Sequence, residues 1–179
     1  MKPTFLLIFV YALVQAAMCG APRPPEPVSA VIAVLRAFEN HDIVMIGEIH
    51  SNKQEYDWYR TLLTTPEFAD RVDDIVVEAG NSLYQEFVDH YVAGENIPLE
   101  QVQKAWRNTV GLSGPPSPLI EDFYKAVREA NLRRPRRHQL RIVCGDPAID
   151  WNLVSDTVKG LHTVSLYSTR RDPFYAQVV

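Results

Sequence analysis

The sequence has few of the residues that mark a nucleotide, zinc or serine-hydrolase site. Only two of its 179 residues are cysteine, Cys19 and Cys144, and no cysteines or histidines stand at the spacing of a zinc site. It has no glycine-rich phosphate loop and no Gly-x-Ser-x-Gly turn to present a nucleophilic serine. Any chemistry must therefore come from other residues.

No apolar run reaches the length of about 20 residues that a membrane-spanning helix needs. The run from Phe5 to Ala17 follows a charged start and precedes small residues and prolines, which is the order of a secretory signal peptide. We therefore expect residues 1–20 to be a cleaved signal, residues 21–27 an extended linker, and the protein to be periplasmic or extracellular. A lipid anchor at Cys19 is less favoured, because residues 16–18 fit a lipidation motif poorly.

Residues 28–179 are enough for one domain with its own core. The formal net charge of −4 argues against a nucleic-acid partner. Loss of Cys19 with the signal would leave a single cysteine, so no intrachain disulfide could form. Stability must then come from packing.

Three short apolar runs, at residues 43–46, 75–77 and 140–144, predict buried parallel strands. Helical spacing precedes and separates them, and Ser51 is the expected N-cap of one helix, with Gln54 at the capping-box position. This alternation predicts an α/β fold in three layers, with a mainly parallel sheet and helices on both faces. The last residues resemble a helix start cut short, so we expect a domain truncated at its C-terminus.

Polar side chains follow each of the three predicted strands. Glu48 and His50 follow the first, Glu78 the second and Asp146 the third. Ligands of parallel sheets bind at the carboxyl ends of the strands. Glu48 and His50 are two residues apart, so they share one side of an extended segment, and Gly47 would let a ligand approach closely.

Such a cluster predicts an acid/base site or a metal site with oxygen and nitrogen ligands, in both cases formed by Glu48, His50 and Glu78. Water activated there could attack an ester, amide or lactone in a small-molecule or peptide substrate, with Gly47 and Asp146 as candidate substrate contacts. A structural explanation also exists, in which Glu48 caps the next helix, His50 satisfies a loop carbonyl and Glu78 pairs with an arginine.

These residues resemble the superfamily that joins erythromycin esterases, haem-binding iron-uptake lipoproteins and Tiki-type proteases. The resemblance covers residues 43–150 and is carried by Gly47-Glu48-x-His50, by Glu78 and by Gly145-Asp146. It implies Glu48, His50 and Glu78 as residues of the cleft. The family pattern also has a second histidine after a further strand, and His162 is only a weak substitute for it.

Three functions follow as expectations from this pattern. The first is an exported hydrolase that uses a Glu/His cluster, with or without a divalent metal. The second is an uptake protein that binds haem or a metal without turnover. The third is an inactive fragment that keeps the fold, because family membership alone does not fix a reaction.

Overall fold

The computed structural model describes residues 26–110, 118–154 and 158–179. The predicted signal at residues 1–20, Cys19 and most of the linker lie outside the described residues. The chain divides into one unit of residues 1–33 and another of residues 34–179. Helix α2 (Ala30–Ala37) crosses that boundary, and all later elements belong to the second unit. Among the described residues, no helix combines the length and the apolar character that a bilayer span requires.

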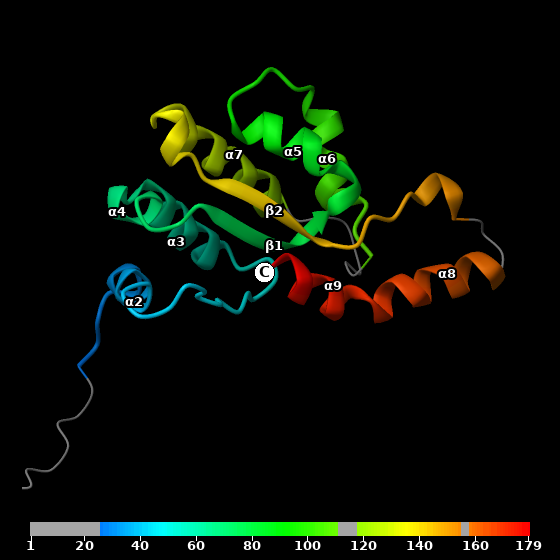
Figure 1. Cartoon of the computed structure of the whole chain (residues 1–179), viewed down its shortest axis with the longest axis horizontal. Coiled ribbons are helices and arrows are strands. Elements are labelled where there is room, and N and C mark those ends of the chain that lie inside the picture. Colours follow the sequence, from blue (N-terminus) through cyan, green and yellow to red (C-terminus); the bar gives the residue numbers. More distant parts are fainter. Residues whose placement is uncertain (1–25, 111–117, 155–157) are drawn as a thin grey trace, which may run out of the picture. The chain divides into compact units, whose positions relative to one another are not determined.

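Two parallel strands form the sheet of the second unit (Figure 1). Strand β1 (Asp74–Asn81) pairs with β2 (Arg141–Asp146), and Val76 lies opposite Val143. Their branched apolar residues suit a pleated surface that is covered by helices. The strands predicted at residues 75–77 and 140–144 are therefore confirmed.

Helices account for most of the remaining chain, as their apolar spacing predicts. Between β1 and β2 the chain forms α5 (Gln85–Val92), α6 (Leu99–Arg107) and α7 (Pro118–Leu132). Helix α6 packs on β1, α5 packs on β2, and α7 packs on α5. The other helices of this unit are α3 (Lys53–Thr64), α4 (Pro66–Ala69), α8 (Val158–Thr169) and α9 (Arg171–Val178).

The core lies where α5, α6 and α7 meet the sheet. Trp106 and Tyr124 are each about 1% exposed, and their ring centroids are 4.6 Å apart. Val102 and Ile142 are fully buried. Burying such a side chain stabilises a fold by roughly 1.5–3 kcal/mol. The stability of this unit therefore depends on the packing of its core.

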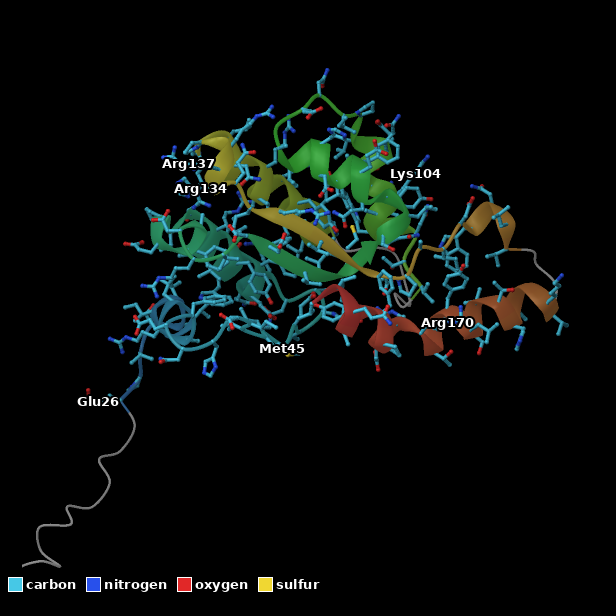
Figure 2. All side chains as sticks on the ribbon, in the orientation of Figure 1. Glu26, Met45, Lys104, Arg134, Arg137 and Arg170 are labelled. Carbon is cyan, nitrogen blue, oxygen red and sulfur yellow. The ribbon has the colours of Figure 1, made fainter. Side chains whose placement is uncertain are left out.

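The expected first strand, at residues 43–46, is wrong for this structure. Residues 43–49 have no regular secondary structure, and no strand is hydrogen-bonded to them among the described residues. Ile43, Met45 and Ile46 are 55%, 86% and 43% exposed, and Met45 is labelled in Figure 2. A strand needs a partner for its backbone and cover for its side chains, and this segment has neither here. The described sheet therefore has two strands, and a three-layer arrangement is not established.

The expected cap of α3 is also corrected. Asn52, not Ser51, is the N-cap, and its side-chain oxygen accepts from Glu55 N at 3.2 Å. Ser51 instead takes a positive φ of 63°, which is uncommon for a residue other than glycine. The chain therefore turns sharply between His50 and the helix.

Side-chain amides close the outer edge of β2. Gln85 accepts from Cys144 N at 2.7 Å and donates to Ile142 O at 2.7 Å. Asn131 does the same at Leu140, accepting from its N–H and donating to its C=O, each at 2.8 Å. These amides take the place of a neighbouring strand at Leu140, at Ile142 O and at Cys144 N.

Replacing Asn131 by Ala should destabilise the fold by about 2–3 kcal/mol. Asn131 is fully buried, and its amide also donates to Val92 O. The change would therefore leave the backbone groups of Leu140 and the carbonyl of Val92 without these hydrogen bonds. Urea unfolding followed by circular dichroism measures the change. Asn40→Ala, at an exposed turn, is the matched control and should stay within about 0.5 kcal/mol of the native chain. Equal midpoints for the two variants would contradict this role.

Candidate functional site

Glu48 and His50 form a pair beside the start of α3. His50 Nδ1 lies 3.5 Å from Glu48 Oε1, and the two side chains are 64% and 28% exposed. Tyr56, one turn into α3, donates from its hydroxyl to the same Glu48 oxygen at 2.9 Å. The carboxylate thus has a hydroxyl on one side and an imidazole on the other. The sequence expectation that Glu48 and His50 share one side of the segment is met by this contact.

The helix start holds this segment in place. Glu55 accepts from Ile49 N at 2.9 Å and from the Tyr59 hydroxyl at 2.5 Å. Since Glu55 N also bonds to the Asn52 cap, one short stretch of α3 secures the backbone between Glu48 and His50. The position of the pair therefore depends on local hydrogen bonds.

Tyr56 is suited to act as a fixed donor. Burial is the main cause that raises its pKa above the usual value, and the hydrogen bond to Glu48 raises it further. Its ring packs edge-on against Tyr59 and Phe123, with centroids 5.6 and 6.4 Å apart. The phenol therefore keeps its proton at neutral pH and continues to donate to Glu48.

Glu78 and Asp146 are joined by Arg171 of α9. Arg171 Nη2 lies 2.8 Å from Glu78 Oε1, and Arg171 Nε lies 2.6 Å from Asp146 Oδ1. The second oxygen of Asp146 accepts from Val110 N at 3.0 Å. Asp146 is 1% exposed, and burial raises the pKa of its carboxyl while Arg171 opposes that rise. One guanidinium thus satisfies the acids at the ends of both strands.

Tyr175, one turn after Arg171, completes the contact of α9 with the strands. Its hydroxyl donates to Val76 O at 3.1 Å, and its ring covers Gly145, where a Cβ atom would collide with it. A side chain at position 145 would therefore push α9 away.

The predicted site residues are thus separated into two groups. Glu48 contacts His50, and Glu78 is linked to Asp146, but within the described residues no hydrogen bond or ion pair joins one group to the other. No three His, Cys, Asp or Glu side chains in the described ranges are grouped to hold a metal ion. A metal shared by Glu48, His50 and Glu78 does not fit this arrangement.

The structural explanation of these residues holds in part. Glu78 does pair with an arginine, whereas Glu48 leaves the cap of α3 to Asn52. A Cβ atom at Gly47 would meet nothing within 4 Å, so no part of the described protein packs closely on this glycine. Residues 133–138, just before β2, include four arginines. One of them, Arg134, is labelled in Figure 2 and donates to the carbonyls of Leu63 and Thr65 at the end of α3.

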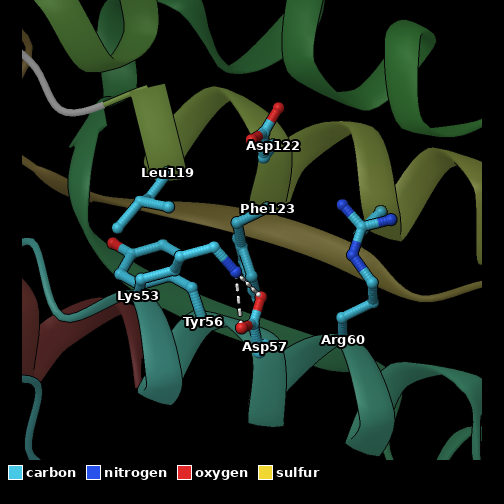
Figure 3. Close-up of a pocket in the computed structure, with 8 residues that line it drawn as sticks. Lys53, Tyr56, Asp57, Arg60, Leu119, Asp122 and Phe123 are labelled. Carbon is cyan, nitrogen blue, oxygen red and sulfur yellow. Dashed lines mark hydrogen bonds and ion pairs between the residues drawn. The ribbon is translucent and has the colours of Figure 1, made fainter.

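A shallow depression of about 230 Å³ lies between α3 and α7 (Figure 3). Phe123 and Tyr56 supply aromatic walls, and Lys53 pairs with Asp57 across its rim at 2.6 Å. Tyr56 therefore lines the depression and also bonds Glu48. The other lining residues are Arg60, Leu119, Asp122 and Ala126.

The comparisons with known proteins found no matching family model, no matching curated protein and no matching solved structure. The resemblance to the erythromycin esterase superfamily therefore stays a prediction from the residues that carry it.

Stability should depend on pH through Asp146. Its folded pKa is raised, so the folded state holds this proton more tightly, and the stability it contributes at low pH is lost as pH rises above about 4. Asp146→Asn should remove that slope. Arg171→Met should steepen it and cost roughly 3 kcal/mol at neutral pH, because it leaves the buried acid without its counter-charge.

Urea unfolding at a series of pH values measures both effects. Arg170→Met removes an exposed arginine one residue away and serves as the matched control, with no expected change of slope. An Arg171→Met variant with the native slope would contradict the assignment.

Proposed function

We propose that this protein is a hydrolase of small esters or related acyl compounds, with Glu48 and His50 as its acid/base pair. The observation that carries the proposal is the contact of His50 Nδ1 with a carboxylate that Tyr56 holds in place. A carboxylate that accepts a hydrogen bond from Nδ1 fixes the imidazole tautomer and leaves Nε2 free to take a proton. At 3.5 Å, His50 and Glu48 need a small side-chain shift to form that bond.

The reaction uses water as nucleophile. His50 Nε2 takes a proton from water as the oxygen attacks the acyl carbon, and Glu48 stabilises the imidazolium that forms. The imidazolium then returns the proton to the leaving alcohol as the carbon–oxygen bond breaks. The products are a carboxylic acid and an alcohol.

The start of α3 supplies groups for the negative charge that develops on the substrate oxygen. The backbone N–H groups of Lys53 and Gln54 have no recorded hydrogen-bond partner among the described residues. Free N–H groups at a helix start favour an anion, and donors aimed at such an oxygen stabilise the transition state. His50 precedes them by only a few residues.

The depression beside Tyr56 supports a small substrate. It lies between α3 and α7 and combines aromatic walls with a charged rim. An acyl group seated against Phe123 would place its carbonyl near Tyr56. Export of the chain, as expected from residues 1–20, would place this reaction outside the cytoplasm.

His50→Ala and Glu48→Gln should each lower the hydrolysis of p-nitrophenyl acetate by about 100-fold, since a positioned base contributes at least that much. The release of p-nitrophenol measures the rate. Tyr56→Phe keeps the ring and removes the donor to Glu48, so a smaller loss is expected.

His90→Ala is the matched control for these variants. His90 is another exposed histidine with a carboxylate partner, Glu95, at 3.0 Å, but it lies on α5 away from α3. Its replacement should leave the rate unchanged. Equal rates for His50→Ala and His90→Ala would remove the basis of the proposal.

A further inference from the structure

The two outer edges of the sheet differ. The outer edge of β2 is closed by the amides of Gln85 and Asn131. In the described part of the chain, the outer edge of β1 accepts a hydrogen bond from the Tyr175 hydroxyl at Val76 O, and the Tyr124 hydroxyl donates to Ala79 O, where the ladder is irregular. An edge with unpaired N–H and C=O groups is a template for another strand.

The backbone groups that point outward from β1 can be identified from the ladder. Asp73 O accepts from Arg141 N of β2, so the residues at steps of two, Ile75 and Val77, also address β2. Asp74 and Val76 therefore direct their backbone groups to the open side, and the ladder becomes irregular after Val77. The bond from Tyr175 to Val76 O agrees with this alternation.

One segment of the chain has the character of the missing neighbour. Residues 43–46 are Ile-Val-Met-Ile, and Ile43, Met45 and Ile46 are exposed. Short runs of branched apolar residues suit a parallel strand covered on both faces. The chain from residue 47 to residue 73 contains α3 and is long enough for the helical crossover that joins parallel strands.

We propose that residues 43–47 bind to the open edge of β1 as a third, parallel strand, in a second state of this chain. The register with Ile46 beside Val76 brings Glu48, which follows the new strand, to the end of the sheet where Glu78 lies. Both groups of candidate site residues then lie at the same end of the sheet. The addition of this strand is inferred from the open edge of β1 and the exposed residues 43–46. Its effect on catalysis rests on the hydrolase function proposed above.

Tyr175 competes with this strand. Its hydroxyl occupies Val76 O, an acceptor that the incoming backbone would use. The segment is tethered to the sheet through α3, which favours it over a strand from a second copy. In the observed state, Val76 O accepts from the Tyr175 hydroxyl. In the second state, backbone hydrogen bonds from residues 43–47 would replace that bond along β1.

Disulfide trapping in the full chain tests the proposal. With Cys19→Ser and Cys144→Ala as background, the pair Ile46→Cys and Val76→Cys should oxidise to an intrachain disulfide, because neighbouring strands lie about 4.8 Å apart. Adding Tyr175→Phe should raise the yield several-fold. The matched control joins Ile46→Cys to Val143→Cys, which lies opposite Val76 one strand further away, and should stay reduced.

Hydrogen exchange on the unsubstituted chain provides an independent readout. Strand addition predicts slowed exchange at the amides of Asp74 and Val76, as at Cys144. Fast exchange there, equal disulfide yields in both pairs, or a disulfide that links two chains would each overturn the proposal. Neither readout uses hydrolysis, so a failure here is separate from a failure of the proposed function.

Discussion

The arrangement of this protein depends on the ion pairs of Arg171 with Asp146 and Glu78. Asp146 is almost fully buried, and a buried carboxylate without a partner costs several kcal/mol. Arg171 provides the counter-charge and at the same time holds α9 against both strand ends. Because Glu78 and Asp146 are both paired with Arg171, they are separated from the pair of Glu48 and His50.

The sheet is asymmetric for a related reason. The amides of Gln85 on α5 and Asn131 on α7 bond to the outer side of β2, whereas the Tyr175 hydroxyl bonds to the outer side of β1 at Val76. Ile43, Met45 and Ile46 stay exposed, although β1 offers an edge with which their segment could pair. An exposed apolar run of this kind in a folded chain marks a contact surface.

Local patterns in the sequence predicted most of the helices and both observed strands. The strands at residues 75–77 and 140–144 could be predicted from their branched side chains, and they pair with each other. Helix α7 could be predicted from its apolar spacing. Residues 43–46 have the same pattern, yet they form no strand here, because a strand also requires a free edge and the sequence does not say what occupies it. Tyr175 lies 99 residues from Val76 along the chain.

The candidate site was predictable to the same extent. The contact of Glu48 with His50 follows from their spacing in an extended segment. The bond from Tyr56 depends on how α3 turns after Ser51, and the pairing of Glu78 with Arg171 joins residues 93 positions apart. An acid after a buried strand signals that a basic partner must exist, but many lysines and arginines could supply it. Only the fold selects Arg171.

The central claim is that Glu48 fixes the tautomer of His50 and leaves Nε2 as the base. Nitrogen-15 NMR, through the two-bond couplings of the uncharged imidazole, measures the position of its proton directly. The account predicts that His50 carries its proton on Nδ1 and that Glu48→Gln shifts it toward Nε2. A proton on Nε2 in the native chain, unchanged by Glu48→Gln, would contradict the claim.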